Sequence, residues 1–210
     1  MPDFKKSCKN AINNDALVDK HAHIKSFNAQ TILSKDTRYL IVGTLTPCQA
    51  RNPKDYSCGY FYCGEHNLMY EFIDGSFDDG LSLVKAKEEF KKDWKSNKNI
   101  KDILNKRRIA FLDVIKEAIV FSDSTDDNDI YPFIFDIDAF RDAIPYLNNL
   151  KVVANSKNAK EALILIYKKL NIDKDIDFIP QSNRWSGLTK NQLQEKWKSF
   201  FCLYNNNLCE

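Results

Sequence analysis

Residues 38–42, Arg38-Tyr39-Leu40-Ile41-Val42, form a short apolar run that stops at Gly43 and is followed closely by Pro47. A run of this length bounded by glycine and proline predicts a strand buried on both faces, which is typical of parallel sheets. Ligands of open parallel sheets bind beyond the carboxyl ends of the strands, where helix N-termini also point. We therefore expect the functional site within residues 43–67.

The rest of the chain alternates between short apolar runs and segments with helical periodicity. This alternation predicts an α/β fold, a three-layer sandwich in which a four-stranded, mainly parallel sheet carries helices on both faces. Residues 1–37 are expected to form a helical extension with a helix near 15–27, and residues 123–129 a surface loop. Further strands are predicted at 109–114, 150–154 and 175–179, a short extended piece at 131–135, and helices at 67–73, 81–97, 100–106, 137–147, 155–170 and 189–200.

The length of 210 residues favours one domain spanning residues 1–210. A chain of this size buries about 70% of its unfolded surface when it folds. No apolar run approaches the roughly 20 residues of a membrane span, and the N-terminal residues lack the apolar core of a signal peptide. We expect a cytoplasmic monomer.

Charge is unevenly distributed although the net charge is only +2. Lys and Arg outnumber Asp and Glu between Lys85 and Arg108, whereas Asp predominates between Asp123 and Asp142. A basic stretch can steer a phosphate backbone toward the protein. A solvated helix of mixed charge explains residues 85–98 equally well.

The chain contains six cysteines but no C-x-x-C pair, so zinc-ribbon and redox motifs are unsupported. Cys48, Cys58 and Cys63 cluster near the expected site, and we interpret them as reduced thiols. His21 and His23 lie two residues apart, and on a helix they would occupy different faces. We therefore predict no metal and no cofactor.

Four strand ends should bring neutral polar groups to one edge of the sheet. Such groups, together with aromatic rings, suit a planar heterocycle held by stacking and by hydrogen bonds to its edge. They suit phosphate poorly, because the chain has neither G-x-x-x-x-G-K-[ST] nor G-x-G-x-x-G. The groups are Gly43-Thr44, Asp113, Asn155-Ser156 and Gln181-Ser182, with Tyr62 and Asn67 from the first long loop.

Short motifs along the chain resemble those of the uracil-DNA glycosylase superfamily. Leu40-Ile41-Val42-Gly43 with Pro47, then Phe61-Tyr62 and Asn67, resembles its first motif, and most of all that of the hypoxanthine/uracil-DNA glycosylase branch. Segments 109–115, 152–157 and 179–182 match later motifs in order. The resemblance covers roughly residues 38–200.

The resemblance implies a monofunctional DNA glycosylase that hydrolyses the N-glycosidic bond of a flipped uracil or hypoxanthine. Asn67 would position the attacking water, and Phe61 or Tyr62 would stack on the base. The loop after the fourth strand would enter the duplex, with Arg184 or Trp185 as wedge. The implied residues are Asn67 and Thr44 for catalysis, Gly43, Leu45, Phe61, Tyr62 and Asn155 for the base, and Ser182, Asn183, Arg184, Trp185 and Lys157 for DNA.

Several alternatives remain open. Three residues separate Gly43 from Pro47 where the family has two, which also fits a catalytically altered or inactive member that binds nucleic acid or a nucleoside. Asn67 is also a good helix N-cap, and such a residue can be purely structural.

A thiol-dependent hydrolase would use Cys48 or Cys63 but lacks a convincing histidine partner. Some relatives in the superfamily hold an iron–sulfur cluster on four cysteines, with a spacing that Cys48, Cys58 and Cys63 do not share.

Overall fold

The computed structural model contains two four-stranded sheets, one parallel and one antiparallel. It describes residues 17–18, 21–31, 33–45, 60–62, 67–93, 97–120, 130–180 and 187–202. The strands are β1 (Leu17–Val18), β2 (His21–Lys25), β3 (Tyr39–Gly43), β4 (Ile109–Asp113), β5 (Ile115–Val120), β6 (Ile130–Phe135), β7 (Lys151–Ala154) and β8 (Asp177–Phe178). The helices are η2 (Asn28–Gln30), α2 (Met69–Asp74), α3 (Leu83–Asp93), α4 (Lys98–Lys106), α5 (Ile137–Ala143), η5 (Ile144–Asn149), α6 (Lys157–Lys169) and α7 (Lys190–Cys202).

The main sheet has the strand order β4-β3-β7-β8, and all its neighbouring strands are parallel. The central strand β3 and its neighbour β4, at the edge of the sheet, are buried along their whole length. The predicted four-stranded parallel sheet is therefore confirmed. β8 is shorter than expected and exposed, which suits an edge strand.

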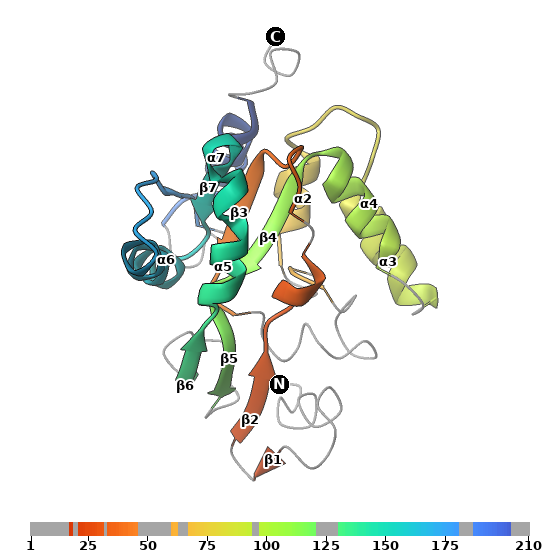
Figure 1. Ribbon diagram of the computed structural model, residues 1–210. Helices are drawn as coiled ribbons and strands as arrows, with labels where there is room; N and C mark the ends of the chain where they lie inside the picture. The colour runs from red at the N-terminus through yellow and green to blue at the C-terminus, as the bar shows by residue number, and fades with distance from the viewer. Residues whose placement is uncertain are drawn as a thin grey trace.

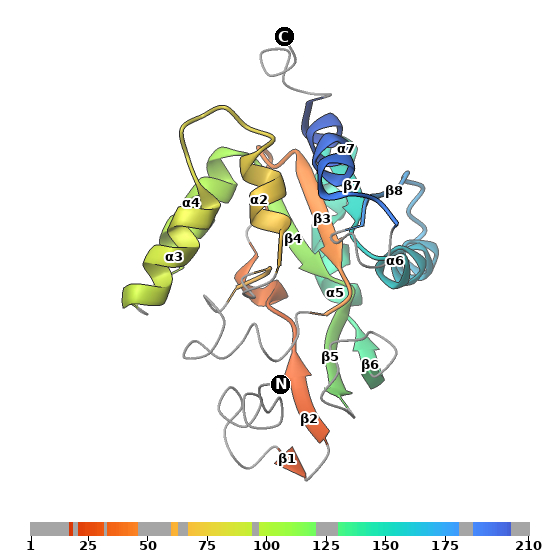
Figure 2. The same cartoon turned by 180° about the vertical axis from the view of Figure 1, so that it is seen from behind.

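Helices cover both faces of this sheet, as predicted. Tyr39 and Ile41 of β3 pack in one core with α2, α3, α4 and α7, whereas Leu40 and Val42 pack in a second core with α5, η5 and α6. This division follows from the alternation of side chains along a strand. Figure 1 shows α5 on the near face, and Figure 2 shows α2 and α7 on the opposite face.

Local sequence signals start several helices where they were expected. Asp136 accepts a hydrogen bond from the amide of Ala139 at the start of α5, and Ser156 accepts one from Ala159 at the start of α6. Thr189 and Gln192 form a reciprocal capping box before α7. Among the described residues, no helix has the length and apolar character required to cross a bilayer.

The prediction of a helix at residues 15–27 is wrong in the described part of that range. Leu17–Val18 and His21–Lys25 are strands β1 and β2, and they join β5 and β6 in an antiparallel sheet of order β1-β2-β5-β6. Pairing with β5, nearly a hundred residues later in the chain, overrides the weak helical pattern. Only Val114 separates β4 from β5, so this second sheet lies beyond the carboxyl end of β4 (Figure 1).

Candidate functional site

The carboxyl ends of β4, β3 and β7 bring Asp113, Gly43 and Asn155 together. Gly43 and Asp113 are direct partners in the parallel ladder, and the amide of Asn155 donates to the carbonyl of Val42 over 3.0 Å. All three residues are buried, with Asp113 only 2% and Asn155 only 3% exposed. Strand register alone therefore places a carboxylate and an amide beside the glycine.

Tyr62 completes this cluster from the loop before α2. Its phenol oxygen accepts a 2.8 Å hydrogen bond from the side-chain amide of Asn155. Its backbone has a φ of 57°, a left-handed conformation that is uncommon for a large side chain. Residues in this conformation persist where the surrounding contacts fix them, and such positions concentrate at functional sites.

Gly43 is required by this packing. A Cβ atom at Gly43 would lie 2.7 Å from Oδ1 of Asp113 and 2.9 Å from the phenol oxygen of Tyr62, with Nδ2 of Asn155 at 3.7 Å. Real Cβ atoms essentially never approach other heavy atoms below 3.0 Å. Gly43, Tyr62, Asp113 and Asn155 therefore form a close-packed polar group, which we call the edge cluster.

Electrostatics keep the Tyr62 phenol neutral. Burial raises the pKa of Tyr62 well above its ordinary value, and the nearby Asp113 carboxylate and Tyr70 raise it further. A neutral phenol both donates and accepts hydrogen bonds. The edge cluster thus contains a phenol, an amide and a carboxylate, which are the groups that bind polar ring edges.

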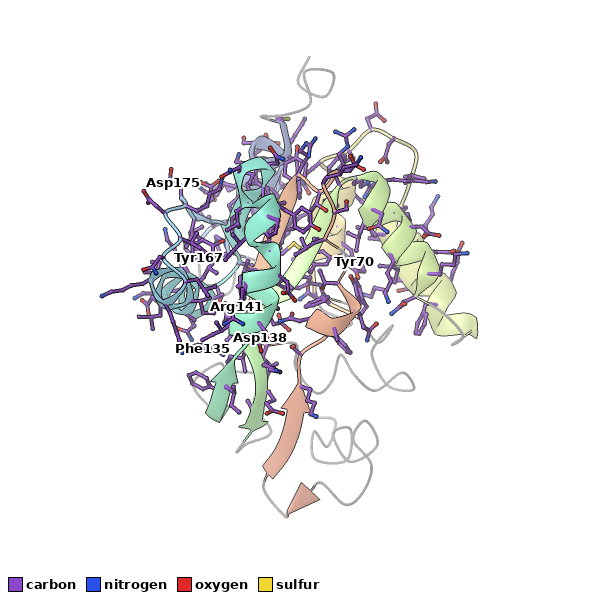
Figure 3. All side chains as sticks on the ribbon, in the orientation of Figure 1. Tyr70, Phe135, Asp138, Arg141, Tyr167 and Asp175 are labelled. Carbon is purple, nitrogen blue, oxygen red and sulfur yellow. The ribbon has the colours of Figure 1, made fainter. Side chains whose placement is uncertain are left out.

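Aromatic rings support the cluster from the side of α2. The Tyr62 ring meets Phe111 edge-on with ring centroids 4.8 Å apart, and Phe61 packs against Phe27 and Phe111. Phe61 is fully buried, and its carbonyl accepts a 2.7 Å hydrogen bond from Tyr70 of α2, labelled in Figure 3. The structure places Phe61 in the core and Tyr62 in the edge cluster.

The remaining residues of the first turn lie beside the start of α6. The hydroxyl of Thr44 lies 2.9 Å from that of Ser156, the N-cap of α6. Leu45 is buried in the core beneath α5 and α6. Lys157, the first residue of α6, is exposed and lies 3.9 Å from Glu161.

The side chain of Asn67 supports the start of α2. Its Oδ1 accepts a 2.9 Å hydrogen bond from the amide of Met69. The N-cap of α2 is Leu68, so the predicted N-cap position of Asn67 is wrong by one residue, and Asn67 binds the first helical amide from the position before the cap. The structure thus gives Asn67 a structural role at the start of α2.

Several predicted residues lie outside the described part of the chain. These are Ser182, Asn183, Arg184 and Trp185, together with His66 and the three cysteines Cys48, Cys58 and Cys63. Within the described ranges, no group of His, Cys, Asp and Glu side chains is arranged to hold a metal ion.

Asn28 is the residue of the site that the sequence did not indicate. Asp113 was expected at the sheet edge, since an aspartate that ends a buried strand is itself a signal. The side chain of Asn28 binds both the backbone amide and the backbone carbonyl of Asp113. No local pattern marks Asn28, because its partner is 85 residues away.

Comparison with known proteins extends this description. The solution NMR structure of a proposed uracil DNA glycosylase from Methanosarcina acetivorans aligns with a TM-score of 0.52 over 81% of this chain and 92% of that chain. The two chains share a fold. Their sequences are 17% identical, so the likeness concerns architecture alone. No family model and no curated protein matches the sequence.

Proposed function

We propose that this protein is a DNA glycosylase that removes uracil or hypoxanthine from DNA. The observation that carries the proposal is the edge cluster, in which Tyr62, Asp113 and Asn155 converge over Gly43 at the carboxyl edge of a parallel sheet. Two further observations support it: the fold is shared with a protein described as a proposed uracil DNA glycosylase, and the motifs around Gly43 resemble that superfamily.

The proposed reaction adds water across the bond between C1′ of deoxyribose and the base nitrogen. The hydroxyl of water joins C1′, the bonding electrons leave with the base, and a proton restores the base to its neutral form. Positive charge develops on the sugar and negative charge on the base as the bond breaks. Donors aimed at the departing base can each contribute about 3 kcal/mol in a site without water.

In this proposal the residues have distinct roles. Asn155 and the backbone amides that follow Gly43 face the oxygens of the base, and Tyr62 contacts its ring. Asn67 orients the attacking water and cannot act as a base, because an amide does not accept a proton at neutral pH. Thr44 assists at the same turn. Lys157 and residues 182–185 contact the DNA backbone or enter the duplex.

The test is the release of free base from oligonucleotides that carry one deoxyuridine or one deoxyinosine, with an unmodified duplex as control. We expect the wild-type protein to release base from a modified strand. The rate of release should fall about 10²-fold or more in Asn67→Ala. Asn67→Asp is the matched variant, since it keeps a side-chain oxygen that can accept from the amide of Met69. Failure of the wild-type protein to release any damaged base contradicts the proposal.

A second candidate function is a binding module without turnover. It is favoured by one observation, that the side-chain oxygen of Asn67 already accepts a hydrogen bond from the amide of Met69, the first residue of α2. Such a module would bind modified DNA without releasing base, and phosphate-driven binding would weaken steeply with salt. Titration of single- and double-stranded DNA at two salt concentrations, alongside the release assay, separates the two functions.

A further inference from the structure

Among the described strands, β4 lies at the edge of the main sheet, and side chains bind backbone groups on its outer side. The hydroxyl of Thr31 donates to the carbonyl of Phe111 over 2.6 Å. The side chain of Asn28 accepts from the amide of Asp113 over 2.7 Å and donates to the carbonyl of Asp113 over 2.8 Å. One side-chain amide therefore makes both contacts that a neighbouring strand would supply.

Asn28 also connects this strand end to α5. Its amide nitrogen lies 2.9 Å from Oδ2 of Asp136, whose other oxygen caps α5. The amide of Asp136 in turn donates to the carbonyl of Val114 over 2.9 Å. The Asn28 side chain is 93% buried as part of this network, since the residue exposes only 7% of its surface.

The structure assigns Asn28 as the positioning residue of the edge cluster, which holds Asp113 in contact with Gly43 and Tyr62. The inference rests on the proposed function in so far as it concerns catalysis. The side-chain amide of Asn28 fixes both backbone groups of Asp113. It thereby fixes the Cα–Cβ direction in which the Asp113 side chain leaves the strand. That direction brings Oδ1 against Gly43, the contact that excludes any larger residue there.

The chemistry of this position demands an asparagine. Asp offers the same shape and an acceptor for the Asp113 amide, but it cannot donate when ionised, and its charge would face Asp136. Ala offers neither donor nor acceptor and would leave the Asp113 amide and carbonyl without these partners. Asn28→Asp and Asn28→Ala therefore remove different parts of the same contact.

The experiment compares Asn28→Ala and Asn28→Asp with Asp79→Asn. This control weakens an ion pair with Arg107, which precedes the amino end of β4, whereas Asn28 binds Asp113 at the carboxyl end of that strand. The ring ¹³C resonances of Tyr62, in protein labelled at tyrosine, report the position of Asp113 beside the phenol. We expect them to move in both Asn28 variants and to stay in place in Asp79→Asn. Asn28→Asp, which retains shape and acceptor, provides the measurement if Asn28→Ala fails to fold.

Base release gives the second readout. A misplacement of about 1 Å in a catalytic site can cost about 10²-fold in rate, so kcat should fall at least about tenfold in both Asn28 variants with KM little changed. Asp79→Asn should keep kcat within about twofold of wild type. Unchanged Tyr62 resonances in folded Asn28 variants overturn the inference. Absence of base release by the wild-type protein overturns the proposed function instead, and the resonances still decide the role of Asn28.

Discussion

The side-chain amide of Asn155 donates a 2.8 Å hydrogen bond to the phenol oxygen of Tyr62, across 93 residues of sequence. This bond joins the carboxyl end of β7 to the loop that precedes α2. Both partners are buried, and the Tyr62 backbone adopts its left-handed conformation at this point. The contact therefore holds a large aromatic side chain over the carboxyl edge of the sheet.

Tyr62→Phe should lower the free energy of unfolding by about 1–3 kcal/mol, because the buried amide of Asn155 loses its acceptor. The aromatic packing against Phe111 is retained in this variant. Tyr146→Phe, a change at a partly exposed ring, should stay within about 0.5 kcal/mol of wild type. Urea unfolding of the three proteins measures the difference, and equal midpoints for both variants would contradict the prediction.

Gly43→Ala should displace the edge cluster, because its Cβ would meet Asp113 and Tyr62 at 2.7 and 2.9 Å. We expect a loss of about 1–3 kcal/mol in stability, as for other overpacked buried sites, and loss of base release. Gly75→Ala is the comparison variant, since the nearest atoms its Cβ would meet belong to the end of the Gln194 side chain, away from the edge cluster. Base release by Gly43→Ala at the wild-type rate would argue against a site at this edge.

Two buried tyrosines, both labelled in Figure 3, should respond oppositely to loss of their hydroxyl groups. The Tyr167 hydroxyl is buried on α6 and has no hydrogen-bond partner among the residues that the structure describes, whereas that of Tyr70 donates to the carbonyl of Phe61. An unpaired buried hydroxyl costs free energy. Tyr167→Phe should therefore be neutral or stabilising by up to about 1 kcal/mol, and Tyr70→Phe should cost about 1 kcal/mol or more. Thermal unfolding monitored by circular dichroism distinguishes the two outcomes.

The ion pairs of Arg107 should make stability depend on pH in acid. Its guanidinium binds Asp79 through two nitrogens and Asp74 through a third contact of 2.7 Å. The hydrogen bonds from Arg107 lower the pKa of Asp79 below its ordinary value. A carboxyl whose pKa is lower in the folded state contributes stability above its unfolded pKa of about 4, and loses it as the pH falls toward the folded value.

Asp79→Asn tests this contribution. The unfolding free energy of wild type should exceed that of the variant by on the order of 1 kcal/mol at pH 7, and the difference should shrink as the pH falls below about 4. Urea unfolding at several pH values between 7 and 3 gives the comparison. A difference that is constant across this range would show that Asp79 acts through shape and not through charge.

The parallel core could be predicted because its signals are local. The uninterrupted apolar run before Gly43 indicated a strand buried on both faces, and Asp136, Ser156 and Thr189 marked the starts of helices. The second sheet could not be predicted in the same way. β2 is held by pairing with β5, a long-range contact whose partner nothing in residues 21–25 specifies.

The candidate site likewise contains residues whose positions could be predicted from local sequence and residues whose positions could not. The pattern of apolar runs and turn residues by itself determined that Gly43, Asp113 and Asn155 lie at the ends of three strands. The length and burial of a strand depend on consecutive residues, so they can be read from the local sequence. Only the tertiary structure decided that Tyr62 lies over Gly43 and that Asn28 binds Asp113. These contacts depend on side-chain directions and loop paths, which are set by packing among distant segments and leave no periodic trace in the sequence.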